Sequence, residues 1–422
     1  MGLVAHVTDV EGKWDKIADF ARDNPAVSLE GDRLILADGA SFVFGGDAID
    51  RGPWSRRVVA TLLDAKERYG ERVVLLAGNR DINKMRLARE LTGHPPKRTP
   101  PEIVAQGRVA LLRWIFQNTM GAKDAFEMRR AELANEASPG QRSAEDPRAA
   151  DDRKRTVSDE DVVQSFLDDV QPDGALARYL AACQLAHRVD LTLFVHGAVT
   201  EENWGTVPGA PHRTPSTDEW VASLNAFYRA QIEAFRDRRL GAHGEPLWAP
   251  IVDYQAPLAG TRLHQGSVVY GRPADPLGNP SLPPRAVMEQ LQRDGIGRVV
   301  VGHTPSGDAP TVLVDDGFQL VIADNSYSRV ERGNQLLIDG AWLRARGLCK
   351  LDDGAEHAVI CELADLSARG PIGLRDISTG RLVKGRLVSG DLLAFRFREA
   401  FTAEQIALTE EEAARLRLAI AR

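Results

Sequence analysis

"SFVFGGDAIDRG", Ser41–Gly52, is the stretch that decides the fold. It begins with an apolar run that is typical of a strand buried on both faces. A glycine-rich turn follows at once and carries Asp47, Asp50 and Arg51. Because the carboxyl ends of strands in an α/β sheet meet in one crevice, polar residues at this point predict a site at the edge of a sheet.

Five other apolar runs end in the same way, in polar or glycine-rich turns. They cover residues 3–8, 72–79, 191–197, 298–304 and 318–325. Apolar residues at helical spacing follow the first two strands of the chain, over residues 14–24 and 55–70, with Gly70 as the expected helix end. Strands that alternate with helices in this way predict an α/β layered domain.

Composition narrows the class of protein. The chain has 422 residues and a net charge of −7, which gives no overall electrostatic reason to expect nucleic-acid binding. Cys183, Cys349 and Cys361 are widely spaced and predict reduced, buried thiols rather than a disulfide framework or a zinc ribbon. No apolar run reaches the roughly 18 residues of a membrane-spanning helix. We expect a cytoplasmic protein without a membrane partner, and its oligomeric state stays open.

The alternation of strands and helices is interrupted twice. We expect a core over residues 1–345, with a mainly helical insertion at 84–186 and a mixed, partly Pro/Gly-rich insertion at 198–297. Residues 346–422 change character and predict a C-terminal β-rich module. The last stretch, residues 402–422, has amphipathic spacing and predicts a terminal helix.

The expected strand ends carry a set of side chains suited to metal binding. Asp9 and Glu11 follow the first strand, and later strands end at Asp47, Asn79, His196 and His303. Carboxylates, an amide oxygen and imidazoles suit ions such as Mn²⁺, Fe or Zn²⁺. Two such ions close together need a bridging carboxylate, for which Asp47 is the candidate.

With these residues the sequence resembles the calcineurin-like metallophosphoesterases, and most of all their phosphoprotein phosphatase and diadenosine tetraphosphatase branch. That family reads D-x-H, G-D-x-x-D-R-G, G-N-H-E/D, a lone His before Gly, and G-H. The corresponding blocks here are Asp9-Val10-Glu11, Gly46–Gly52, Gly78-Asn79-Arg80-Asp81, His196-Gly197 and Gly302-His303. The resemblance covers about residues 1–90 and 188–330 and implies a four-layer α/β/β/α sandwich.

The resemblance also implies roles for single residues. Asp9, Asp47 and Glu11 would bind a first metal ion, and Asp47, Asn79, His196 and His303 a second. Arg51 would grip a phosphate oxygen with its planar fork, and Asp50 would orient the residue at position 80. A metal-bound hydroxide would attack phosphorus.

Two positions depart from the family pattern. Glu11 replaces the His of D-x-H, and it is either a ligand for a harder ion or a cap for the following helix. Arg80 replaces the His that the family uses to protonate the leaving group or to stabilise the transferring phosphate. Arg cannot give up a proton at neutral pH, but it can neutralise charge on phosphate. The UDP-diacylglucosamine pyrophosphatases of the same superfamily also show G-N-R-D, although they lack the D-R-G extension.

A phosphate leaving group needs an acid less than an alkoxide does, so Arg80 narrows the expected leaving group. We expect hydrolysis of a phosphoanhydride or activated phosphoester in a nucleotide-like small molecule. Two divalent ions would take part, manganese first and Fe, Zn or Mg as alternatives. The alternatives are a serine/threonine-type protein phosphatase, with the insertions as docking surfaces, and an inactive phosphatase that acts as a binding module.

Residues outside the motifs complete the expectations. His6 lies inside the first strand and is expected in the core. His212 and His264, on the second insertion, match no family motif and are expected to be surface or structural residues, with supply of the missing acid as the alternative. Tyr270, Arg272, Tyr327 and Arg329 are the aromatic and basic residues expected to line a substrate cleft.

Overall fold

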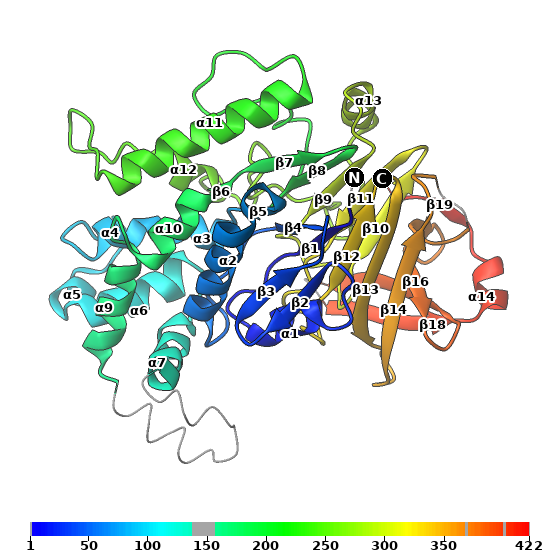
Figure 1. The fold of residues 1–422 in the computed structure, drawn as a ribbon, viewed down its shortest axis with the longest axis horizontal. Helices are drawn as coiled ribbons and strands as arrows, with labels where there is room; N and C mark the ends of the chain where they lie inside the picture. Colours follow the sequence, from blue (N-terminus) through cyan, green and yellow to red (C-terminus); the bar gives the residue numbers. More distant parts are fainter. Residues whose placement is uncertain (1, 137–156, 368–369, 400–401, 422) are drawn as a thin grey trace.

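The computed structural model describes residues 2–136, 157–367, 370–399 and 402–421 (Figure 1). The larger sheet runs in the order β18 (Thr402–Leu408), β17 (Leu392–Glu399), β16 (Leu382–Leu387), β14 (Glu356–Leu363), β13 (Trp342–Lys350), β12 (Gln335–Asp339), β1 (Val4–Val7), β4 (Ser41–Phe44), β5 (Val73–Leu76) and β6 (Cys183–Gln184), with β15 (Leu374–Asp376) and β19 (Leu418–Ile420) at its side. Strands β1, β4, β5 and β6 are parallel, so their carboxyl ends share one edge.

The smaller sheet runs in the order β10 (Thr311–Asp315), β11 (Phe318–Ile322), β9 (Arg298–Val301), β8 (Thr192–Val195) and β7 (Ala186–Val189). Strands β8, β9 and β11 are parallel to one another. A separate hairpin is formed by β2 (Val27–Glu30) and β3 (Arg33–Leu36). All six strands expected from apolar runs are confirmed, as β1, β4, β5, β8, β9 and β11.

The two sheets pack face to face through apolar side chains. Val43 and Val74 of the larger sheet share one buried cluster with Phe194, Val300 and Val321 of the smaller sheet. Because side chains alternate along a strand, the neighbours of Val43 in β4 face the other way. That opposite face carries helices, so each expected strand is buried on both sides.

Helices cover the outer faces of both sheets. The expected helices after β1 and β4 are confirmed as α1 (Trp14–Ala21) and α2 (Ser55–Tyr69), and Gly70, with φ 56°, ends α2 as expected. Phe20 of α1 packs on Phe42 of β4 with ring centroids 5.4 Å apart. On the smaller sheet, α11 (Thr217–Arg236) lies along β7 and α13 (Arg285–Arg293) packs nearby (Figure 1). The fold is α/β, and this order of layers is consistent with the expected helix–sheet–sheet–helix sandwich.

The secondary-structure elements described between β5 and β6 are all helical. They are α3 (Asn79–Asn83), η2 (Lys84–Arg86), α4 (Leu87–Glu90), α5 (Pro101–Ala105), α6 (Arg108–Thr119), α7 (Ala125–Glu136), α9 (Asp159–Asp169) and α10 (Ala175–Ala182), and the second inserted segment adds α12 (Ala249–Tyr254). Phe116 of α6 meets Phe166 of α9 edge to face at 5.0 Å. These helices gather beside α2, on the side of the molecule away from the C-terminal strands (Figure 1).

The terminal helix expected over residues 402–422 is wrong. The chain forms β18 there, then the short α14 (Glu410–Ala414) and the strand β19. Glu404, a polar residue of β18, is buried because Arg381, Arg396 and Arg398 all pair with it. Pairing with β17 and these ion pairs outweigh a helical pattern that the sequence carries locally.

The C-terminal strands extend the core sheet. Val4 of β1 pairs with Ile338 of β12, and β13, β14, β16, β17 and β18 follow outward in antiparallel order. The module expected over residues 346–422 is thus hydrogen-bonded into the sheet that carries the site, and its domain boundary stays a prediction. The three cysteines are buried and free, as predicted. Within the described ranges, no helix has both the length and the apolar character needed to span a membrane.

Candidate active site

The turns after the strands carry a strained backbone. Positive φ angles occur at the non-glycine residues Asp9 (52°), Glu11 (53°), Asp47 (56°), Asp50 (115°) and His303 (57°). A residue with a Cβ atom adopts such angles only when its surroundings impose them, and these residues cluster at functional sites. All five are residues that the sequence singled out, so the strain and the motifs mark the same place.

Direct hydrogen bonds join the strand ends of the two sheets at this place. The His303 N–H donates to the Asp9 carboxylate at 3.2 Å, and His196 Nδ1 lies 2.8 Å from the Gly45 carbonyl oxygen. Gly46 has φ 100°, and a Cβ atom there would lie 2.7 Å from His196 Nδ1 and from the Gly78 nitrogen. The second glycine of "GGD" is therefore required for the two sheets to approach so closely.

Four donor atoms from four strand ends converge. Asn79 Oδ1 lies 2.7 Å from His303 Nδ1 and 3.2 Å from His196 Nε2, which is itself 3.3 Å from Asp47 Oδ1. Because His196 Nδ1 donates to the Gly45 carbonyl, the neutral ring turns the lone pair of Nε2 toward these oxygens. Carboxylate, amide oxygen and imidazole nitrogen atoms gathered at one point are ligands that divalent metal ions use, so this group fits such an ion.

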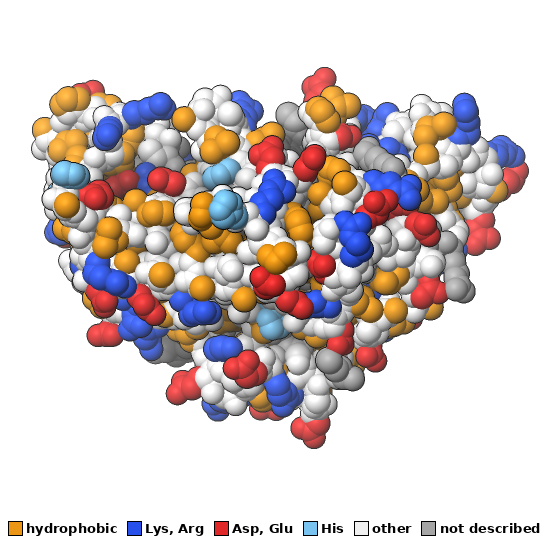
Figure 2. Space-filling model, turned by 90° about the horizontal axis from the view of Figure 1, so that it is seen from above, with side chains coloured by type: hydrophobic (Ala, Val, Ile, Leu, Met, Phe, Trp, Pro, Cys, Tyr) orange, Lys and Arg blue, Asp and Glu red, His pale blue; other side chains and the backbone are white. Residues whose placement is uncertain are grey.

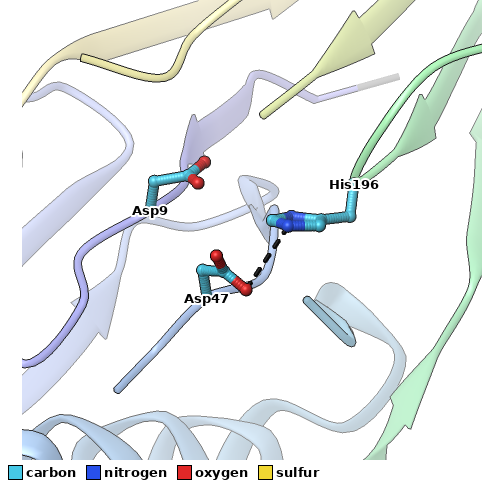
Figure 3. Close-up of side chains that lie close together, drawn as sticks. All are labelled: Asp9, Asp47 and His196. Carbon is cyan, nitrogen blue, oxygen red and sulfur yellow. Dashed lines mark ion pairs between the residues drawn. The ribbon is translucent and has the colours of Figure 1, made fainter. Parts of the chain in front are cut away.

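Asp9 joins the same group from β1. Asp9, Asp47 and His196 each offer a ligand atom within 4.8 Å of the others, and they point toward a common space (Figure 3). Burial, together with the charges of Asp324 and Asp47, raises the pKa of Asp9 well above its usual range. His303 Nε2 is buried without a hydrogen-bond partner. The predicted ligands Asp9, Asp47, Asn79, His196 and His303 are thus brought together.

Asp81 organises this group from behind, and the sequence analysis did not assign it a role. Its carboxylate accepts hydrogen bonds from the N–H groups of Asp47 (2.9 Å), Ala48 (2.9 Å) and Gly78 (3.0 Å). Burial, and then the nearby charge of Asp47, raises its pKa to about 8. As the last letter of G-N-R-D, Asp81 was within the quoted motif, and its place two residues after a candidate ligand was the available signal.

Arg80 turns toward the carboxylates of the site. Its Nε lies 2.7 Å from Glu11 Oε1 and 3.6 Å from Asp47 Oδ2, and its Nη1 lies 3.6 Å from Asp50 Oδ2. Its Nη2 donates to the Tyr327 hydroxyl at 2.6 Å. The guanidinium therefore lies among three acidic groups next to the metal-ligand set.

Glu11 lies between two arginines. Its Oε2 accepts from Arg51 Nη1 at 2.8 Å and from the Ser326 hydroxyl at 3.0 Å, and its Oε1 pairs with Arg80. Burial raises the pKa of Glu11, but the charges of Arg80, Lys16 and Arg51 outweigh it, and the net shift is downward. Glu11 does not cap α1, whose N-cap residue is Lys13. Whether Glu11 also binds metal stays a prediction.

Arg51 and Asp50 pair with residues that lie outside their own motif. Arg51 donates to Glu331 at 3.1 Å and stacks 3.7 Å from the centroid of the Tyr327 ring. Asp50 lies near Arg80 but pairs more closely with the buried Lys84, at 2.6 Å. Glu331 and Tyr327 are far from the motifs along the chain, so motif spacing gave no signal for their pairs, whereas Lys84 stands three residues after Asp81.

A cleft of about 720 Å³ opens over the site. The residues that line it include Arg80, Arg86, Tyr270, Arg272, His303 and Tyr327, and residues 117–121 and 255–257 complete its walls.

The expectation that Tyr270, Arg272 and Tyr327 line a cleft is confirmed. It is wrong for Arg329, which pairs with Asp352 because β13 ends beside it. His212 and His264 do not line this cleft, and His6 is buried in the core, stacked on Phe194 as expected.

Known proteins were compared with this chain. In solved structures, it is similar to a cold-active protein-tyrosine phosphatase of Shewanella sp. (16 % identity, 85 % of this chain and 80 % of that chain, TM-score 0.43). It is also similar to a protein serine/threonine phosphatase of Saccharomyces cerevisiae (13 %, 80 % and 72 %, TM-score 0.34). A third is a metallophosphoesterase of Sphaerobacter thermophilus (10 %, 86 % and 89 %, TM-score 0.31).

No curated protein matches the sequence. A family model does match residues 2–120, that of the calcineurin-like phosphoesterases. The matched range contains Asp9, Asp47, Asn79 and the arginines beside them. Residues 2–120 of the chain are thus similar to the calcineurin-like phosphoesterases.

Proposed function

We propose that this chain hydrolyses a phosphoanhydride or an activated phosphoester in a nucleotide-like small molecule. The observation that carries the proposal is the position of Arg80, which lies at the metal-ligand set and is held by Glu11 at 2.7 Å. A guanidinium stays charged at neutral pH and therefore cannot protonate a leaving group. A leaving group that is already stable as an anion, such as phosphate, is the one that this site suits.

Asp9, Asp47, Asn79, His196 and His303 would hold the divalent ion, for which manganese is the first candidate. A bound ion supplies a polarised phosphoryl oxygen and a water of lowered pKa. The chain itself holds these five side chains in place. Asp81 positions Asp47, because its carboxylate accepts a hydrogen bond from the Asp47 backbone N–H. The sequence predicted two ions at this site.

The residues around the site support charge stabilisation rather than proton donation. His303, the histidine in the cleft wall, has a pKa held well below its usual range, first by burial and then by the charge of Arg272. His212 and His264, the alternative source of an acid, are not among the residues that line the cleft. Of the arginines that line the cleft, Arg80 pairs with Glu11 and Arg86 with Glu90, whereas Arg272 donates to the His303 carbonyl and is the one that we expect to meet a substrate phosphate.

The size of the cleft supports a small molecule. Small-molecule sites commonly measure about 300–1,000 Å³, and the cleft of about 720 Å³ lies in this range. The aromatic rings of Tyr270 and Tyr327 in its walls offer surfaces on which a base can stack.

On the face seen in Figure 2, acidic and basic side chains are interspersed. The three buried free thiols agree with a reducing compartment, and we place the protein in the cytoplasm.

A substrate panel tests the proposal. The full chain, loaded with Mn²⁺, is assayed on dinucleoside polyphosphates, nucleotide pyrophosphates and phosphoserine peptides, with bis-p-nitrophenyl phosphate as a general reporter. We expect the anhydrides to be turned over faster than the peptides. Equal or faster turnover of the peptides would favour the protein phosphatase, and no Asp47-dependent turnover of any substrate would favour the binding module.

The variant Arg80→His sharpens this test. Histidine restores a group that can donate a proton, so the ratio of phosphoester to anhydride turnover should rise. Arg86→His is the matched control, because Arg86 also lines the cleft but pairs with Glu90 rather than with the site carboxylates. An unchanged ratio in Arg80→His would remove the role that we give to Arg80.

A further inference from the structure

We propose that the Arg80 guanidinium takes the place of the first metal ion, so that this chain binds one divalent ion where the sequence predicted two. The inference rests on the proposed function, because it concerns the same metal-dependent site. It concerns the side of the site formed by Asp9, Glu11 and Asp47, the expected ligands of that first ion.

The oxygens of Glu11 are already engaged by cations. Oε1 pairs with Arg80 Nε at 2.7 Å, and Oε2 pairs with Arg51 Nη1 at 2.8 Å. The Arg80 Nε also lies 3.6 Å from Asp47 Oδ2, the side of Asp47 that faces away from His196. A positive charge therefore lies between two of the three carboxylates that would hold the first ion.

The surroundings keep the guanidinium there. Glu11 is 1 % exposed and the Arg80 side chain 11 % exposed, so the pair is shielded from water. Asp50, behind Arg80, and the Tyr327 hydroxyl, in front of it, add attraction on two further sides. Two like charges a few ångströms apart repel strongly in a buried site, so a dication beside Arg80 would meet a large electrostatic cost.

One exchange accounts for both departures from the family pattern. Residues 11 and 80 lie in separate motifs, yet their side chains touch at 2.7 Å. A histidine at position 11 could bind a metal ion but would not neutralise a guanidinium, whereas glutamate does. The Glu11–Arg80 pair thus replaces a ligand and its ion with a carboxylate and a built-in cation.

The other half of the site is built differently. Asn79 Oδ1, His196 Nε2 and His303 Nδ1 converge with Asp47 Oδ1, and in the described part of the chain no Arg or Lys side chain is hydrogen-bonded to the side chains of Asn79, His196 or His303. The side chain of Asn79 and the two imidazole rings therefore have no cation from a described Arg or Lys side chain against them, unlike Glu11. The geometry therefore assigns one ion to this set together with Asp9, whose carboxylate lies within 4.8 Å of the ligand atoms of Asp47 and His196, and none to the side of Glu11.

The test is the number of ions that the full chain binds. Wild type, Asp47→Asn, Arg86→His and the double variant Glu11→His/Arg80→His are dialysed to equilibrium against Mn²⁺, and bound manganese is measured by elemental mass spectrometry. We expect one ion per chain in the wild type and in the control Arg86→His, less than one in Asp47→Asn, and two in the double variant. Two ions in the wild type, or one in a folded double variant, would overturn the inference.

Electron paramagnetic resonance of the Mn²⁺-loaded wild type gives a second readout that needs no variant. An isolated Mn²⁺ signal supports the inference, and the spectrum of an exchange-coupled pair contradicts it. This readout decides the matter if the double variant does not fold. Failure of this inference can be distinguished from failure of the proposed function, because the number of bound ions and the turnover are measured separately. One bound ion without turnover would contradict the proposed function. Two bound ions with turnover would contradict the inference.

Discussion

The two sides of Asp47 differ in what they offer a ligand. On one side lie Asn79, His196 and His303, which present uncharged donor atoms that face one another. On the other lie Glu11 and two arginines, which satisfy one another as ion pairs. The comparison teaches that equivalent strand ends can either leave a place for a cation from solution or supply the cation from the chain, as Arg80 does.

Asp47 is the residue common to both sides, so its substitution should have the largest effect. Asp47→Asn removes the charge that faces His196 at 3.3 Å and Arg80 at 3.6 Å. We expect a loss of kcat/KM of about 10²–10³-fold, the size found when one charge-stabilising group is removed from an active site. Steady-state kinetics at saturating Mn²⁺ measures it, with the exposed Asp15→Asn as control. A kcat/KM of Asp47→Asn within a few-fold of the wild-type value would show that Asp47 is not essential to both sides of the site.

Substitution of Glu11 tests the arginine side alone. Glu11→Gln leaves Arg51 and Arg80 without their shared carboxylate, and breaking a buried ion pair typically costs about 3–5 kcal/mol. We expect a loss near the lower end in the free energy of unfolding, measured by urea titration. Glu331→Gln is the matched control and should cost less, because Glu331 is more exposed and pairs at the rim of the site. Equal losses in the free energy of unfolding would mean that Glu11 stabilises the two arginines no more than Glu331 does.

Substitution of Asp81 tests the metal-ligand side alone. Asp81→Asn loses one of the acceptor oxygens that hold the N–H groups of Asp47, Ala48 and Gly78. Removing such a supporting group typically weakens metal binding by about 10–100-fold. Isothermal titration with Mn²⁺ measures the affinity, with Asp64→Asn on the surface of α2 as control. Unchanged affinity in Asp81→Asn would show that the ligand turn holds its shape without this carboxylate.

The smallest expected effect concerns the support behind His303. Lys384 of β16 is buried and donates to the carbonyls of Ser306 and Ala309, in the loop that follows His303. Burial lowers its pKa to about 7 from an ordinary value of 10.5. Above pH 7 the folded state therefore holds fewer protons at this lysine than the unfolded state does, so stability rises with pH between about 7 and 10.5.

The measurement compares wild type with Lys384→Met in urea titrations at several pH values. The free energy of unfolding of the wild type, relative to the variant, should rise by about 1 kcal/mol from pH 7 to pH 8. The difference should be nearly flat below pH 6. A difference in the free energy of unfolding that falls as pH rises would contradict the predicted sign. It would show that Lys384, in the C-terminal strand β16, does not support the loop in its uncharged form.

Sequence reasoning reached the features that are local to a strand and its end. The six buried strands were predictable because continuous apolar runs require burial on both faces, and the ligand candidates stand directly after them. The partners were not predictable in the same way. Glu331 lies 280 positions from Arg51 in the chain, and no spacing rule connects them. Residues 402–422 failed for the same reason, because β17 and three arginines, rather than local pattern, decide the conformation around Glu404.

Anomalous diffraction from crystals of the Mn²⁺-loaded full chain tests the central claim most directly. We expect one manganese peak, among Asp9, Asp47, Asn79, His196 and His303, with the Arg80 guanidinium still against Glu11. Two manganese peaks on either side of Asp47, with Arg80 displaced from Glu11, would contradict it.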